Sequence, residues 1–120
     1  MTLNYNMTDE GAFGLITIHG KLLEPHDGKD LLDELAAQIE EGKTRFIVDM
    51  SDVPQMNSSG LNLMIRMLTK TRNNGGELIV VHLSDKVKEL YLTTKLNAIF
   101  TICDTLEEAK DLFQKQTENI

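Results

Sequence analysis

Strands and helices are expected to alternate along most of this chain, and that order strongly limits the folds that it can adopt. Residues 46–50 and 77–83 predict buried strands, and four consecutive aliphatic side chains at residues 78–81 are typical of a strand covered on both faces. Apolar residues at positions i, i+3, i+4 and i+7 predict a helix over residues 58–72. These residues are Leu61, Met64, Ile65 and Leu68. A strand, a helix and a second strand in this order predict a parallel pair joined by a crossover helix.

The flanking segments extend this pattern. Residues 3–7 and 12–19 predict two strands, and the second should point Phe13 and Leu15 to one face and Ile16 and Ile18 to the other. A helix before residue 42, helices after Ser84 and residue 105, and a short strand over residues 99–102 are also predicted. We therefore expect an α/β fold: one domain over residues 1–120, with a mostly parallel sheet, an antiparallel N-terminal strand pair and about four helices.

Charge and cysteine content exclude several classes of function. Nineteen acidic and 12 basic residues give a net charge of −7, which argues against nucleic acids and anionic membrane surfaces as partners. The single cysteine, Cys103, excludes an internal disulfide framework, and the three histidines lack the spacing of metal ligands. No signal peptide is recognisable at the start and no apolar run could span a membrane, so we expect a cytoplasmic protein without a metal or cofactor.

A polar junction between a predicted strand and a predicted helix is the strongest candidate for a functional site. Its residues are Asn57, Ser58, Ser59, Gly60 and Leu61. Unpaired backbone N–H groups and the positive end of the helix dipole make such a place suitable for an anion. The simpler interpretation is that a serine caps the helix, which stabilises it by about 1 kcal/mol. A serine hydrolase is disfavoured because the chain has no G-x-S-x-G nucleophile elbow.

The same junction resembles the STAS domain, a family that includes bacterial anti-sigma factor antagonists. The resemblance rests on the strand over residues 46–50, the Ser-Ser-Gly-Leu motif that starts at Ser58, and the helix that ends at Gly75 and Gly76. It continues through residues 77–81, 87–90 and 96–100, so that it covers nearly the whole chain. It implies a non-enzymatic binding module with Ser58 as the phosphoacceptor.

The resemblance also implies the partners. In the antagonist branch, the kinase that phosphorylates the serine is itself the anti-sigma factor, of the GHKL type, and a PP2C-type phosphatase reverses the modification. The unphosphorylated antagonist binds the kinase and frees the sigma factor. We expect this chain to be a monomer or a weak dimer.

Three positions depart from the family pattern near Ser58. The family often has aspartate where this chain has Asn57, an acid after the Gly-x-Leu at residue 20 where it has Leu23, and a second glycine where it has Asn62. Glu24 follows one place later, and we expect it to surround Ser58 together with Asn57, Ser59 and Gly60. The reduced acidity leaves an alternative open, namely a STAS module that binds a small molecule or nucleotide without being phosphorylated.

The predicted helix also carries more apolar residues than one buried face requires. Leu61 should support the helix from below. We expect at least one of Leu63 and Met67 to be exposed at the edge of the helix, and all three residues to contribute to a partner-binding patch beside Ser58.

Overall fold

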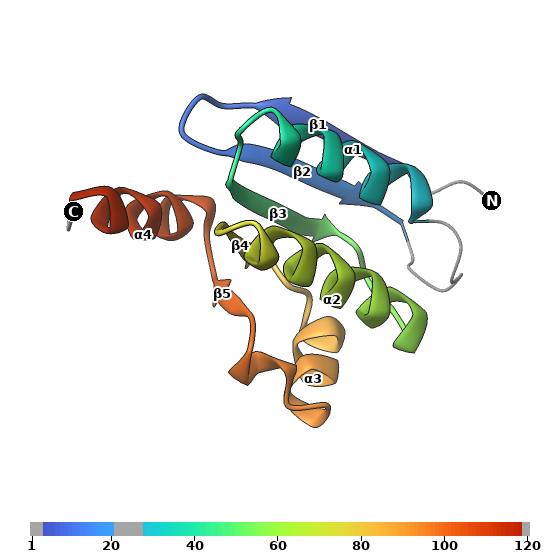
Figure 1. The fold of residues 1–120 in the computed structure, drawn as a ribbon. Helices are drawn as coiled ribbons and strands as arrows, with labels where there is room; N and C mark the ends of the chain where they lie inside the picture. The colour runs from blue at the N-terminus through green and yellow to red at the C-terminus, as the bar shows by residue number, and fades with distance from the viewer. Residues whose placement is uncertain (1–3, 21–27, 119–120) are drawn as a thin grey trace.

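Five strands form a single mixed sheet in the order β1-β2-β3-β4-β5 (Figure 1). The computed structural model describes residues 4–20 and 28–118. The strands are β1 (Asn4–Asp9), β2 (Gly14–His19), β3 (Arg45–Asp52), β4 (Glu77–Val81) and β5 (Thr101–Cys103). β1 and β2 are antiparallel, and the pairs β2–β3, β3–β4 and β4–β5 are parallel. The predicted mostly parallel sheet with an antiparallel N-terminal pair is confirmed.

The described residues form four α-helices, as predicted. They are α1 (Lys29–Glu40), α2 (Ser58–Asn73), α3 (Asp85–Thr93) and α4 (Leu106–Glu118), with a 3-10 turn, η1 (Leu96–Ala98), before β5. None of the helices in this part of the chain is long and apolar enough to cross a membrane.

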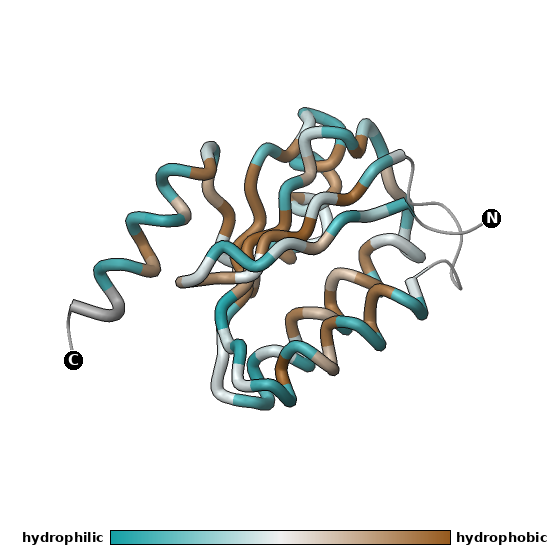
Figure 2. Tube along the Cα trace, turned by 90° about the horizontal axis from the view of Figure 1, so that it is seen from above, coloured by the Kyte–Doolittle hydropathy of each residue, from teal (hydrophilic) through white to brown (hydrophobic). Residues whose placement is uncertain are grey.

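The sheet separates two apolar clusters, and the alternation of side chains along each strand decides which cluster a residue joins. Ile16 and Ile18 of β2 point toward α1, α2 and α3, whereas Phe13 and Leu15 point toward α4, as the sequence predicts. The hydropathy colours of Figure 2 show the hydrophobic segments gathered along the strands in the middle of the molecule. The central strands are therefore buried on both faces, which explains their uninterrupted apolar sequences.

Local chemistry sets the limits of the elements. The hydroxyls of Ser84 and Thr105 accept backbone N–H bonds from Val87 and Glu108, at 3.2 Å each, and so cap α3 and α4. β4 ends at Val81, two residues earlier than expected, because the next residue adopts a positive φ of 60° that cannot continue a strand. The last strand covers residues 101–103 rather than 99–102, since η1 delays its start.

Candidate functional site

The Ser-Ser-Gly-Leu motif lies beyond the carboxyl end of β3, where α2 begins. β3 ends at Asp52 and α2 starts at Ser58, so that a five-residue connection separates strand and helix. In sheets with parallel strands, ligands and partners commonly bind beyond this edge, because helix N-termini and loops gather there. The fold thus presents the motif on the surface at a favourable place.

Asn57, and neither of the two serines, caps α2. Its backbone is extended (φ −118°, ψ −165°), and its side-chain Oδ1 accepts hydrogen bonds from the backbone N–H groups of Ser59 at 2.9 Å and Gly60 at 3.4 Å. These are the N2 and N3 donors that an N-cap residue satisfies. The interpretation of the serines as helix caps is therefore wrong, because the amide oxygen one residue earlier already occupies that role.

The two hydroxyl-bearing residues have different surroundings. Ser58 is the first helical residue and is exposed, whereas Ser59 is half-buried. Within the described residues, the Ser58 hydroxyl makes no hydrogen bond to another protein group. Gly60 and Leu61 are buried, and Leu61 belongs to the cluster between the sheet and the helices, so it supports α2 from below as expected. Ser58 is hence the accessible hydroxyl of the motif.

The expected exposure of Leu63 or Met67 is wrong. Leu63 is 8% exposed because it lies on the edge of α2 beside which α1 packs (Figure 1). Met67 is fully buried because it shares the central buried face of α2 with Met64 and Thr71. Gly28 allows α1 and α2 to approach each other closely, since a Cβ atom there would collide with the Leu63 side chain. A role of these residues in binding a partner stays a prediction, and of the two only Leu63 has access to the surface.

Glu24, the remaining residue of the predicted site, lies outside the described residues, as does the Leu23 position. Its membership of the site stays a prediction. In the described part of the chain, α2 has no acidic residue in its first turn. The immediate surroundings of Ser58 along the helix are thus neutral.

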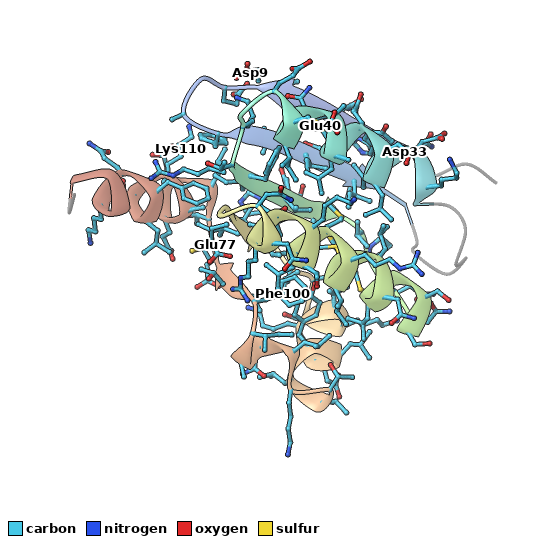
Figure 3. The ribbon with its side chains drawn as sticks, viewed as in Figure 1. Asp9, Asp33, Glu40, Glu77, Phe100 and Lys110 are labelled. Carbon is cyan, nitrogen blue, oxygen red and sulfur yellow. The ribbon has the colours of Figure 1, made fainter. Side chains whose placement is uncertain are left out.

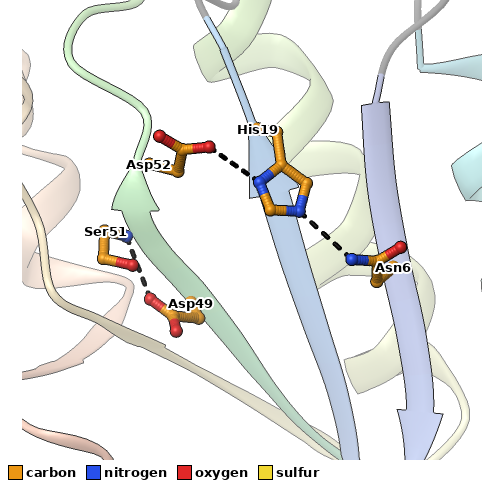
Figure 4. Close-up of polar contacts among 5 residues, drawn as sticks. All are labelled: Asn6, His19, Asp49, Ser51 and Asp52. Atoms are coloured by element: carbon orange, nitrogen blue, oxygen red, sulfur yellow. Dashed lines mark hydrogen bonds and ion pairs between the residues drawn. The ribbon is translucent and has the colours of Figure 1, made fainter.

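Two histidine–aspartate pairs, which the sequence did not reveal, hold the end of β3. His19 of β2 approaches Asp52 with 2.7 Å between Nδ1 and Oδ2, and its other ring nitrogen lies 3.2 Å from the side-chain nitrogen of Asn6 (Figure 4). The backbone N–H of Gly20 also donates to the carbonyl of Asp52 at 2.9 Å. These contacts fix the last residue of β3 on the β2 side.

The second pair acts on the β4 side of the same strand. His82 lies with its Nδ1 3.0 Å from Oδ1 of Asp49, and the backbone N–H of Ser51 donates to the same carboxyl oxygen at 2.9 Å. Burial raises the pKa of Asp49, but the hydrogen bonds from Ser51 and His82 outweigh it, so that the pKa lies below its ordinary value. Ser84, two residues beyond His82, donates its hydroxyl to the carbonyl oxygen of Pro54 at 3.1 Å. The connection that carries the motif is thus braced from the β4–α3 loop.

These braces could have been found in part from the sequence. His19 and His82 both end predicted strands, and Asp49 and Asp52 end the strand between them, so parallel pairing brings the four side chains to one edge. The register that pairs each histidine with one particular aspartate is a tertiary property. Among the described residues, no group of three His, Cys, Asp or Glu side chains could hold a metal ion.

A groove of about 410 Å³ runs between the first halves of α1 and α2 and reaches the motif. Ser59 and Asn62 line it from α2, and Leu32 and Leu63 form its apolar floor. The charged residues at its rim are Lys29, Asp33 and Arg66. The site therefore consists of an exposed serine beside a groove that can accept an apolar group.

This chain is similar to known proteins along most of its length. The model of the STAS domain matches residues 6–109. The anti-sigma-B factor antagonist of Staphylococcus aureus is 25% identical over 107 residues, which are 89% of this chain and 98% of that protein.

The fold is also that of solved antagonist structures. The anti-sigma factor antagonist SpoIIAA in its unphosphorylated form superposes with a TM-score of 0.77 at 19% identity, over 93% of this chain and 97% of that one. An anti-sigma factor antagonist from Mycobacterium paratuberculosis gives a TM-score of 0.77 at 18% identity, over 94% and 95% of the two chains. At these identities the likeness shows the shared fold.

Proposed function

Because this chain belongs to the STAS domain family, we propose that it is a partner-switching regulator of the anti-sigma factor antagonist type. It binds an anti-sigma factor that is also a serine kinase of the GHKL type, and phosphorylation of Ser58 controls that binding. A PP2C-type phosphatase restores the unmodified form. The protein acts by binding, and Ser58 is the substrate of the kinase rather than a nucleophile.

The observation that carries this proposal is the division of roles between Asn57 and Ser58. Asn57 caps the helix, so the exposed Ser58 hydroxyl is left without a structural role among the described residues. A kinase can reach that hydroxyl without undoing the helix start. A curated relative named as an anti-sigma-B factor antagonist, matched along 98% of its length, supports the antagonist role in general.

The electrostatics at Ser58 permit a phosphorylated state of the folded protein. A phosphate adds roughly −1.5 to −2 charges, and the N-terminus of a helix attracts negative charge. No acidic residue stands in the first turn of α2, and Asn57 is neutral. Phosphorylation is therefore expected to change the surface that a partner meets while the domain stays folded. A neighbour of the same fold has been solved in a phosphorylated form, the Bacillus protein SpoIIAA.

The net charge of this chain predicts the charge of the surface that its partner presents. With 19 acidic and 12 basic residues, the chain attracts a basic protein surface and repels nucleic acid and anionic lipid. We expect the partner to approach the sheet edge beyond β3 with a surface that is basic overall. The interaction should accordingly weaken as the salt concentration rises.

The decisive experiment incubates the protein with ATP and the GHKL-type kinase encoded in the same genome, followed by phosphosite mapping by mass spectrometry. Phosphate is expected on Ser58 in the wild type and in Ser59→Ala, and no incorporation is expected in Ser58→Ala. Ser59→Ala is the matched control, since it removes the neighbouring hydroxyl and leaves the Asn57 cap in place. Phosphate on neither serine, or on Ser59 alone, would refute the assignment of Ser58.

The alternative, a module that binds a small molecule or nucleotide, would use the groove beside Ser59. Asp33 at its rim is paired with Lys29, so that Arg66 is the cation there that the phosphates of a nucleotide would meet. A thermal-shift series with ATP and GTP distinguishes the two functions. Stabilisation by either nucleotide that Ser59→Ala or Arg66→Gln abolishes would favour the alternative.

A further inference from the structure

The groove between α1 and α2 combines an apolar floor with a cation at its rim. Leu32 is half-buried and Leu63 is 8% exposed, so both still offer apolar surface to an incoming group. Gly28 packs against Leu63 so closely that a Cβ atom there would collide with it, and this contact forms part of the groove wall. An apolar side chain of moderate size can therefore enter between the helices, in a space of about 410 Å³.

Arg66 is the cation of the rim that is available to a partner. It is exposed, and in the described part of the chain no carboxylate pairs with it. Lys29, by contrast, is held by Asp33, whose carboxylate lies 2.9 Å from the Lys29 ammonium (Asp33 is labelled on α1 in Figure 3). An arginine fork binds a carboxylate through two parallel N–H bonds, so Arg66 favours an acidic group over a neutral one.

We propose that the α1–α2 groove binds a segment of the protein partner that presents an apolar side chain next to a carboxylate. The apolar side chain lies on Leu32 and Leu63, and the carboxylate pairs with Arg66. The partner's surface is basic overall, but this segment carries an acidic residue. The pairing of that residue with Arg66 fixes the position of the segment along α2. The inference deepens the proposed function, since it assigns the partner contact that phosphorylation of Ser58 would control.

The position of the groove explains how Ser58 could control it. Ser59, Asn62, Leu63 and Arg66 recur at i, i+3, i+4 and i+7, so they share one face of α2. Ser59 and Arg66 are separated by seven residues, or about 10.5 Å along the helix axis. A phosphate on Ser58 adds roughly −1.5 to −2 charges eight residues before Arg66, or about 12 Å along the axis. This is about one and a half times the screening length of about 8 Å at physiological salt, so the repulsion of a carboxylate at Arg66 is partly screened. The acidic segment is repelled there, and binding weakens.

Two short peptides test the groove without any kinase. They are acetyl-Gly-Leu-Glu-Gly-amide and its counterpart with glutamine in place of glutamate, and each is titrated into isotope-labelled full-length protein while backbone amide NMR shifts are recorded. The acidic peptide should shift amides of residues 28–33 and 59–66 and bind about threefold more tightly than the neutral one, the size expected for an exposed ion pair.

Variants separate the ion pair from general charge effects. Arg66→Gln should abolish the preference for the acidic peptide, whereas Lys115→Gln, which removes the same charge from the exposed face of α4, should preserve it. Ser58→Glu should weaken the acidic peptide more than the neutral one. Equal affinity for both peptides, shifts outside these residues, or a preference that survives Arg66→Gln would overturn the inference. Failure here leaves phosphate mapping on Ser58 unaffected, so the two proposals fail separately.

Discussion

Tyr91 offers a sharp test of the packing, because its hydroxyl group is buried without a partner. The side chain of Tyr91 is fully buried, and its ring lies against Phe100 with 5.2 Å between the ring centroids and 56° between the planes. Within the described residues, the Tyr91 hydroxyl oxygen makes no hydrogen bond. A buried polar group in this situation costs about 1–3 kcal/mol of stability. Tyr91→Phe removes the hydroxyl and keeps the ring.

We therefore expect Tyr91→Phe to stabilise the protein by about 1 kcal/mol at neutral pH, with a small loss for the void that remains. A second effect appears at high pH. Burial raises the pKa of the Tyr91 phenol far above its ordinary value of about 10. Above pH 10 the unfolded chain releases this proton and the folded protein keeps it. The wild type then loses about 1.4 kcal/mol per pH unit from this group, and the variant does not.

The measurement is urea denaturation at pH 7 and pH 11, with the wild type and the variant side by side. The stability difference in favour of Tyr91→Phe should grow by about 1.4 kcal/mol between the two pH values. Tyr5→Phe is the matched control, because the other tyrosine is only half-buried, and burial together with the nearby Glu34 also raises the pKa of its phenol. The reasoning is refuted if Tyr91→Phe destabilises the protein at pH 7, or if the difference is the same at both pH values.

Three further changes test the local structure. Asn57→Ala should cost about 1 kcal/mol, measured as a lower urea midpoint with an unchanged m-value, and an unchanged midpoint would deny the cap. Gly76→Ala should lower the stability by about 3 kcal/mol in the same assay, because its Cβ would collide with the Thr44 carbonyl oxygen. Gly75→Asn is the control, since asparagine tolerates the φ of 79° there and should change the stability by only a few tenths of a kcal/mol. Equal effects of the two substitutions would contradict the collision. Asp49→Asn should make the stability of the protein depend less on pH below about pH 4. The lowered pKa of Asp49 means that its ionised form stabilises the fold above that pH, and this contribution is lost as the pH falls through the folded pKa. An unchanged dependence of stability on acid pH would exclude a stabilising contribution from ionised Asp49.

The succession of strands and helices along the chain, and the faces of the strands, could be predicted because they follow from local pattern. Each of these patterns can be recognised from residues that are close together in the sequence: the apolar runs, the period-two alternation in β2 and the apolar stripes of the helices. The caps at Ser84 and Thr105 were likewise visible, since capping depends on side chains within three residues. The ends of the elements were less predictable, since β4 ends at Val81 because of the positive φ at His82.

The candidate site was predictable in its motif and unpredictable in its contacts. The motif at Ser58 stands out from sequence, but which of Asn57, Ser58 and Ser59 caps α2 depends on the backbone angles at the helix start. The burial of Leu63 depends on how closely α1 approaches α2, which no residue of α2 specifies.

The sequence by itself thus determined the mixed α/β sheet and the presence of a serine at the start of α2, because periodicity and helix-start chemistry are local. Only the tertiary structure decided that Asn57 satisfies the helix donors and leaves Ser58 exposed, and that His19 and His82 hold β3 from its two sides. It also placed Arg66 at a groove shared with α1. These contacts join residues that lie far apart in the chain, and they form only when the sheet register and the helix packing bring those residues together.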